Sequence, residues 1–227
     1  LGKCWEEPIK ERALLVLANI DPALCAQVAA GLGLPAPSPT VSLAEPEPSP
    51  ALSQLGGTWP LDGRIVGIVT AGDQDPTGVR SVRQAVLDAG MVPLVIAPTG
   101  GKLDQDGEPI AVQRTFATAR SIEFDAILLA GAPAPGADSY GARDAKVDDD
   151  TAVGAGIDPR VLLMISEAYR HGKALGAWAG GADALEAAGV AADAPGVVAA
   201  DSGETALAAI SELLARHRAW DRFTPAV

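Results

Sequence analysis

The sequence predicts an α/β domain with a doubly wound parallel sheet over residues 63–227. Its apolar runs are continuous rather than alternating, which is typical of strands buried on both faces of a sheet. Helical patterns separate most of these runs, and strands that alternate with helices indicate a parallel sheet covered on both sides. The predicted strands are residues 64–72, 92–98, 125–131, 174–180 and 196–201.

The segments between the strands contain the predicted helices and one exception. The helix at residues 75–90 begins with Asp75 and a proline, a capping residue and a first-turn residue that favour a helix start. In residues 98–125, turn glycines surround a polar alternation, which predicts a small hairpin rather than another strand–helix unit. The other predicted helices are residues 158–172, 182–188 and 204–220.

Two further regions precede this domain. Residues 1–36 contain two short helical patterns, the second with Asp21 as predicted N-cap and Pro22 at the first helical position. Residues 37–62 are rich in Pro, Ser and Glu, and they indicate either an extended, semi-rigid linker or a long ordered loop. Two short helices cannot bury all their apolar side chains against each other, so we expect them to rest on a larger body; these side chains are Leu14, Leu15, Val16, Leu17 and Ile20.

The composition argues against several partners and compartments. Acidic residues outnumber basic ones 29 to 17, and a net charge of −12 repels nucleic acid and anionic membrane surfaces. No apolar run reaches the ~18–20 residues of a membrane span, and no signal peptide is visible, so we expect a cytoplasmic protein. Cys4 and Cys25 are therefore predicted to be reduced. The chain begins with Leu rather than Met, which we interpret as a segment cut from a longer protein.

The stretch KALGAWAGGADALEAAGV, residues 173–190, predicts a sharp turn from a strand into a helix. In many α/β enzymes such a turn activates a nucleophile, because it holds one residue strained beside the N–H groups of a helix start. Here the turn offers Ala179 and Gly180, neither of which is a nucleophile. The two histidines, His171 and His217, fall at predicted helix ends and favour solvated side chains. We therefore predict no catalytic residues and interpret the turn as a structural remnant.

The ends of the other strands give no sign of a cofactor or metal. Asp73 and Asp75 follow the first strand, where a phosphate-binding loop needs closely spaced glycines and no negative charge. Asp75 is better interpreted as a helix cap. Asp148, Asp149 and Asp150 lack a spaced set of partner ligands, so we expect a solvated loop and no metal site.

Four stretches together resemble the PfpI-type branch of the class I glutamine amidotransferase-like superfamily, which is flavodoxin-like. They are IVGIVTAG, AGMVPLVIAPTGGKL, EFDAILLAGAPAP and GKALGAWAGGADALEAAGV, and the resemblance covers about residues 63–200. Active members of that family place a Cys at the position of Ala179, usually a His at Gly180, and an acidic residue near Asp73 or Asp75. The chain departs from the family at both turn positions.

A narrower resemblance covers nearly the whole chain. The start LGKCWEEPIKERALLVLANID, the Pro-rich linker, EAYRHGKALGAWAGG and the ending HRAWDRF are similar to the C-terminal part of large-subunit haem catalases. The resemblance implies that residues 1–36 are the helical tail of a catalase core, residues 37–62 the linker and residues 63–227 a thiol-free flavodoxin-like domain. It also implies a homotetrameric parent that decomposes hydrogen peroxide.

In that family the haem is held in the core by a proximal Tyr and served by a distal His. Neither Tyr140 nor Tyr169 lies in the basic helical context expected of the haem ligand, so we expect no cofactor in this chain. The expected function is a non-catalytic, stabilising accessory domain, with the catalase core and possible unfolded client proteins as partners. The alternatives are a stand-alone PfpI-type hydrolase or deglycase, and a small-ligand-binding module that uses a cavity beside Gly180 and Gly181.

Overall fold

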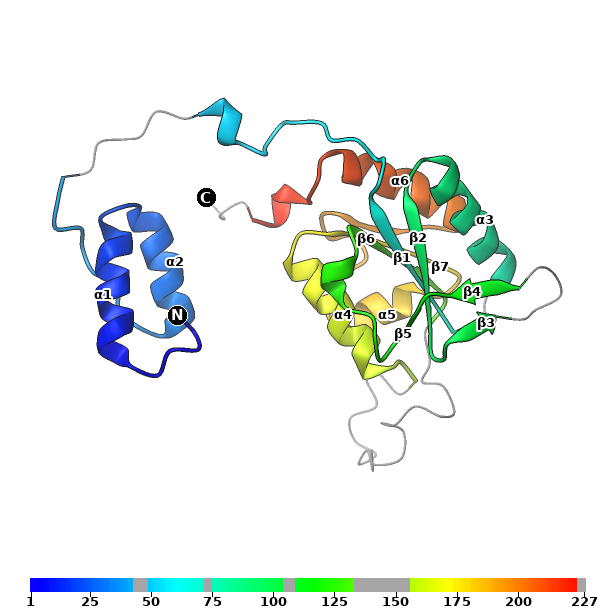
Figure 1. Ribbon diagram of the computed structural model, residues 1–227, viewed down its shortest axis with the longest axis horizontal. Helices are drawn as coiled ribbons and strands as arrows, with labels where there is room; N and C mark the ends of the chain where they lie inside the picture. The colour runs from blue at the N-terminus through cyan, green and yellow to red at the C-terminus, as the bar shows by residue number, and fades with distance from the viewer. Residues whose placement is uncertain (43–48, 72–74, 104–108, 133–155, 224–227) are drawn as a thin grey trace, which may run out of the picture. The chain divides into compact units, whose positions relative to one another are not determined.

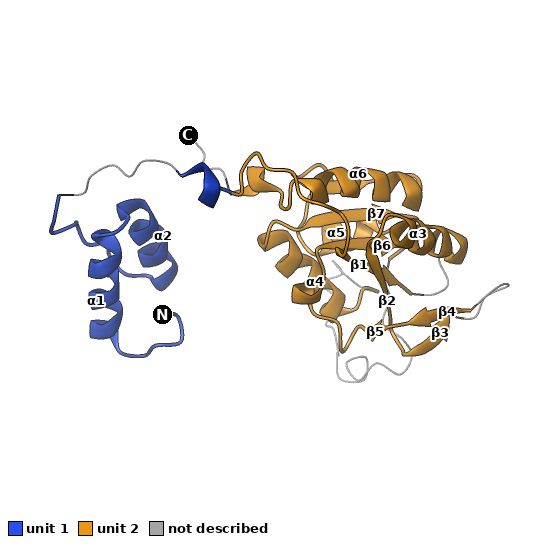
Figure 2. Ribbon diagram, turned by 45° about the horizontal axis from the view of Figure 1, so that its top comes forward, with its two compact units in different colours: residues 1–53 blue, residues 54–227 orange. Residues whose placement is uncertain are grey.

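The computed structural model describes residues 1–42, 49–71, 75–103, 109–132 and 156–223. The chain forms two compact units, residues 1–53 and residues 54–227, which Figure 1 and Figure 2 show in ribbon form. The described residues of the first unit form helices and no strand, and the second unit contains both sheets of the structure.

The second unit is built on a six-stranded parallel sheet with strand order β5-β2-β1-β6-β7-β8. From β2 to β8 this is the flavodoxin-like order, in which the winding direction reverses between β1 and β6. The predicted fold class is thereby confirmed. The strands are β1 (Ile65–Thr70), β2 (Val92–Ala97), β5 (Arg114–Thr115), β6 (Ala126–Ala130), β7 (Ala174–Trp178) and β8 (Val197–Ala199).

Helices cover both faces of the sheet. Helices α3 (Pro76–Asp88) and α6 (Gly203–Ala215) pack on one face, and α4 (Pro159–Arg170) and the short α5 (Ala182–Ala187) pack on the other (Figure 1). Successive side chains of a strand point to opposite faces, so each central strand supplies both cores. On β6, Leu128 packs with α3 and α6, whereas Ile127 and Leu129 pack with α4 and α5.

The segment between β2 and β6 contains the predicted hairpin and one further strand. Strands β3 (Gly101–Leu103) and β4 (Ile110–Val112) pair antiparallel, as expected. The prediction missed β5, which pairs parallel with β2 at the edge of the main sheet. Strand β5 has two residues, and so short a run cannot be recognised as a strand in the sequence pattern.

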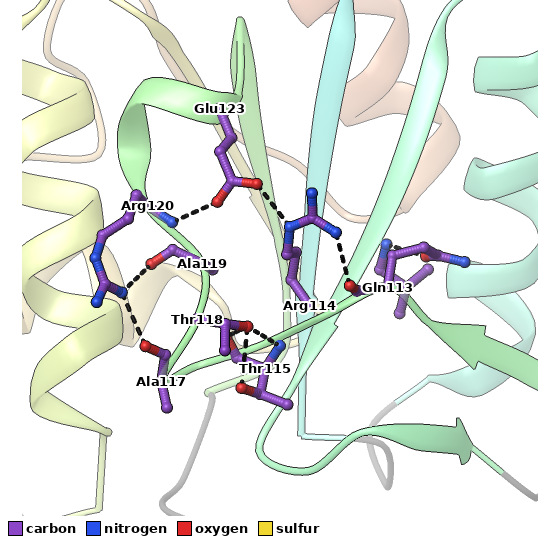
Figure 3. A network of polar contacts seen from close by, with 9 residues as sticks. Gln113, Arg114, Thr115, Ala117, Thr118, Ala119, Arg120 and Glu123 are labelled. Atoms are coloured by element: carbon purple, nitrogen blue, oxygen red, sulfur yellow. Dashed lines mark hydrogen bonds and ion pairs between the residues drawn. The ribbon is translucent and has the colours of Figure 1, made fainter.

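A polar network fixes the chain after β5: the Glu123 carboxylate accepts from Arg114 Nε at 2.6 Å and from the Arg120 backbone N–H at 2.9 Å (Figure 3).

The first unit is a pair of helices, α1 (Glu7–Ala18) and α2 (Pro22–Leu32). The Asp21 carboxylate caps α2 by accepting from the backbone N–H groups of Ala23 and Leu24, as predicted. The unit continues to a 3-10 turn, η1 (Pro50–Leu52). Both cysteines are free thiols. Among the described residues of this unit, the buried core consists of Leu14, Ala18, Cys25 and Ala29.

Helix α1 also carries apolar side chains that α2 does not cover. Ile9, Val16 and Ile20 are 43%, 59% and 67% exposed, and Trp5, just before the helix, is 95% exposed. Ile9 and Val16 are seven residues apart and lie on one side of α1, while Ile20 follows the C-cap Asn19. We call these four residues the α1 stripe. The expectation that these helices leave apolar surface uncovered is confirmed within this unit for Leu15, Val16 and Ile20, while Leu14 is buried.

Candidate functional site: the turn after strand β7

The turn that follows β7 has the strained geometry predicted from the sequence. Ala179 is exposed and adopts φ +50°, and Gly180 adopts φ +88°. A side chain in this left-handed region costs roughly 1–2 kcal/mol, so Ala179 is held there by its surroundings. The Gly181 N–H closes the turn by donating to the Trp178 carbonyl at 2.8 Å, and α5 starts at Ala182.

Gly181 is the residue through which the turn approaches the neighbouring strand. A Cβ on Gly181 would lie 2.4 Å from the Leu129 carbonyl oxygen on β6, well inside contact distance. The Gly131 N–H donates to the Trp178 carbonyl at 3.0 Å, which ties the chain after β6 to the end of β7. The turn is therefore fastened to the strand beside it.

Asp75 joins the turn to the first strand–helix connection. Its Oδ1 accepts from the Gly78 backbone N–H at 2.9 Å, which caps α3 as predicted. Its Oδ2 accepts from the indole Nε1 of Trp178 at 2.8 Å, one residue before Ala179. Asp75 itself has φ +47°. Its hydrogen bond to Trp178 therefore links one strained residue, Asp75, to the residue directly before the other, Ala179. Asp73 lies outside the described residues.

The turn offers no group for nucleophilic catalysis among the described residues. Ala179 presents a methyl group, and both Asp75 oxygens already accept hydrogen bonds. Both histidines lie at the opposite edge of the sheet: His171 follows α4 just before β7 begins, and His217 Nδ1 lies 3.2 Å from Arg64, just before β1. These positions are at the amino-terminal ends of the strands. A base there cannot reach a group at the carboxyl ends of the strands.

His217 differs from its prediction. His171 is exposed as expected, but His217 is half-buried, with its ring centroid 5.7 Å from that of Trp59 and 6.2 Å from that of Trp220. Burial lowers the pKa of His217, the Arg218 and Arg64 guanidinium groups lower it further, and Asp125 acts in the opposite direction. The prediction failed because the Trp and Arg partners come from distant positions in the sequence.

A buried lysine, which the sequence analysis does not predict, also lies at the amino-terminal ends of the strands. Lys173 is only 6% exposed, and its ammonium group donates to the backbone carbonyls of Ser121 and Phe124, the latter at 2.6 Å. Burial and Arg218 lower the pKa of Lys173, against opposite effects from Asp125 and Glu167. Its two carbonyl acceptors make it a structural tie between β7 and the chain before β6.

The Tyr169 and His217 side chains do not fit a haem ligand. The Tyr169 ring is covered by the Arg222 guanidinium, whose carbon lies 4.1 Å from the ring centroid. The half-buried His217 ring contacts the indole rings of Trp59 and Trp220. Tyr140 lies outside the described residues, as do Asp148, Asp149 and Asp150. The described residues contain no group of three or more His, Cys, Asp or Glu side chains placed to hold a metal ion.

A surface hollow of about 450 Å³ lies over α5 and the loop that follows it, lined among others by Ala182, Asp183, Glu186 and Gly189. Its two carboxylates disfavour an anionic ligand. Within the described parts of the chain, no helix is both long and apolar enough to cross a membrane.

The fold and this turn define a class: a flavodoxin-like domain that keeps the strand–turn–helix geometry of a nucleophile turn and carries a methyl group in its place. Comparison with known proteins gives the family. Residues 62–224 match the model of the C-terminal domain found in long catalases, and the chain belongs to this family. The resemblance to the C-terminal region of large-subunit catalases is thereby confirmed.

Individual relatives agree with this assignment. The chain is 34% identical to a catalase HPII of Mycobacterium avium, over all of this chain and 32% of that protein. It is 31% identical to a catalase HPII of Pseudomonas aeruginosa and 26% identical to catalase-2 of Bacillus subtilis, in each case over 98% of this chain and 29% or 30% of the relative. The chain thus spans about a third of the length of these relatives.

Proposed function

We propose that this chain is the non-catalytic accessory region of a long catalase, and that its role is structural. The observation that carries the proposal is the turn after β7, whose geometry is kept while Ala179 replaces a nucleophile. Peroxide decomposition and haem binding then belong to the part of the catalase that this chain does not span. In this proposal the parent is a cytoplasmic homotetramer, and residues 1–36, 37–62 and 63–227 are its core tail, linker and accessory domain.

This assignment makes a direct prediction for the isolated 227-residue chain. Titrating its His171→Asn variant, which removes the exposed histidine, with haemin should give no Soret band characteristic of axial Tyr or His ligation, and adding hydrogen peroxide should release no oxygen above the haemin blank. Tyr169 and His217 are already engaged by Arg222 and by two tryptophans, so neither side chain faces a porphyrin. A saturable Soret band together with oxygen release would overturn the proposal.

The α1 stripe supports a structural role for the first unit. Fully burying a Val or Ile side chain contributes roughly 1.5–3 kcal/mol, so Ile9, Val16 and Ile20 together favour association strongly. We propose that the rest of the catalase chain covers this stripe in the parent protein. In the isolated chain the stripe is an exposed apolar surface of the kind that captures a second copy or an unfolded client protein.

We expect the isolated chain to self-associate, or to suppress aggregation of a heated client protein, through the α1 stripe. The double substitution Val16→Glu with Ile20→Lys places opposite charges on the stripe without changing the net charge. It should shift sedimentation toward the monomer and lower the light-scattering protection of the client. The matched control is Glu11→Gln, on an exposed polar position of the same helix, which should behave as the unmodified chain.

The same comparison separates the stripe from the α/β unit. A shortened chain that begins at Gln54 lacks the stripe but keeps the whole second unit, and it is expected to be more monomeric than the full chain. If the double variant and the shortened chain both hold clients as well as the full chain does, the client-binding surface lies on the α/β unit and this role for residues 1–36 is wrong.

A further inference from the structure

The end of α6 has a backbone conformation that its sequence does not favour. The helix ends at Ala215 with Arg216 as its C-cap, and the next residue, His217, adopts φ +70°. Glycine is usual at this position because a side chain is strained there. A histidine held in this conformation indicates that its side chain makes contacts that offset the strain.

Those contacts fasten the last part of the linker to the α/β unit. The Trp59 backbone N–H donates to the Ala215 carbonyl at 2.8 Å, the carbonyl just before the α6 C-cap. The His217 ring contacts two indole rings, with its centroid 5.7 Å from that of Trp59 and 6.2 Å from that of Trp220. Trp59 is thus held by one backbone hydrogen bond and one ring contact, both from the segment that ends α6.

The charges around His217 require a neutral ring. Arg64 Nη1, just before β1, lies 3.2 Å from His217 Nδ1, so Nδ1 must accept that hydrogen bond. Arg218 Nη1 lies 3.5 Å from the same nitrogen. Asp125, just before β6, is the counter-charge at this edge, but its Oδ1 already pairs with Arg64 at 3.0 Å. The linker and the 3-10 turn at residues 220–222 present Trp59 and Trp220, which are uncharged.

We propose that the neutral ring of His217 holds Trp59 and the end of the linker against the end of α6, which we call the fastened state. Protonation of the ring releases Trp59 and gives the released state. A protonated ring loses the hydrogen bond from Arg64 and gains repulsion from two guanidinium groups. Release reaches no further than residue 60, because Leu61 packs on the core of the α/β unit and the Gly63 N–H donates to the Gly90 carbonyl at 2.9 Å. Freeing residues 54–60 lengthens the tether between the two units by at most about 25 Å, at ~3.3–3.6 Å per residue. Acidification thereby increases the distance that the linker allows between the first unit and the α/β unit.

The direction of the pH dependence follows from the lowered pKa of His217, whose largest cause is burial. The released state takes up a proton more readily than the fastened state, so fastening is strongest above the unfolded pKa of about 6.5. It weakens as the pH falls below that value and through the pKa of the fastened state. Opening should increase by about tenfold for each pH unit that separates the two pKa values.

Two nuclear magnetic resonance measurements on the full 227-residue chain test the proposal together. The first titrates the ring signals of the two histidines and gives the pKa of His217, with the variant His171→Asn assigning the signals. The second follows hydrogen exchange of the Trp59 backbone amide between pH 7.5 and 5, corrected for the intrinsic exchange rate. The loss of protection should match the fold-change that the measured pKa of His217 requires.

The variant His217→Asn provides the decisive comparison, because asparagine tolerates the left-handed backbone and does not titrate. It should protect the Trp59 amide less at pH 7.5 and show no further loss down to pH 5, while His171→Asn should behave as the unmodified chain. Protection that does not change with pH in the unmodified chain would overturn the proposal. So would an acid-dependent loss that persists in His217→Asn.

Discussion

Replacing Gly181 by alanine is expected to destabilise the α/β unit by about 3 kcal/mol, at the upper end of the range for overpacking. The added Cβ would lie 2.4 Å from the Leu129 carbonyl oxygen and 2.9 Å from the Leu129 Cβ. Both belong to or directly adjoin the backbone of a central strand, so neither can rotate away. Either α5 shifts off the sheet or β6 and β7 separate. Urea unfolding followed by tryptophan fluorescence measures the loss.

The neighbouring glycine provides a matched control. Gly180 lies in the same turn at φ +88°, but no other atom lies within 4 Å of a Cβ built on it. Gly180→Ala therefore carries only the left-handed strain, about 1–2 kcal/mol. Gly181 has φ −63°, so its alanine variant carries no such strain and isolates the steric effect. Equal stability of Gly181→Ala and the unmodified chain would show that the close approach of the turn to β6 is wrong.

Much of this fold follows from local pattern. The strands β1, β2, β6 and β7 are continuous apolar runs, and the starts of α2 and α3 carry an Asp–Pro pair whose carboxylate caps the helix. The two departures have non-local causes. Strand β5 forms where two residues pair with the edge of β2. Helix α6 ends at Ala215 rather than near Trp220, and just beyond that end His217 adopts φ +70° with its ring in contact with Trp59 and Trp220.

The turn after β7 is likewise predictable only in part: its backbone geometry follows from the sequence, and its contact with Asp75 does not. A strand, two glycines and a helical pattern suffice to predict the sharp turn at Ala179, and the missing nucleophile is visible in the letters themselves. The bond between Asp75 and Trp178 joins residues about a hundred positions apart, and no local pattern specifies it. The one available signal was Trp178 itself, because a buried indole N–H needs an acceptor at a strand end.

The substitution Ala179→Cys is expected to create a thiol of raised reactivity without disturbing the fold. Ala179 already carries a Cβ at φ +50° and is exposed, so the added sulfur atom introduces no new backbone strain. The turn leads directly into α5, and the N–H groups of a helix start lower the pKa of a nearby thiol. Alkylation by iodoacetamide at pH 7 should be about threefold to tenfold faster than that of an ordinary exposed cysteine.

The control for this reactivity is Glu186→Cys, an exposed position in the last turn of the same helix, where the backbone carbonyls disfavour a thiolate. Peptide mass spectrometry separates alkylation at the introduced thiol from alkylation at Cys4 and Cys25. Similar rates at the two ends of α5 would contradict the turn geometry.

Even a reactive thiol should fail to turn over ester or peptide substrates, because His171 and His217 lie at the amino-terminal ends of the strands, away from the turn. Turnover by the Ala179→Cys variant would mean that the domain retains a base, and that loss of the nucleophile alone silenced it.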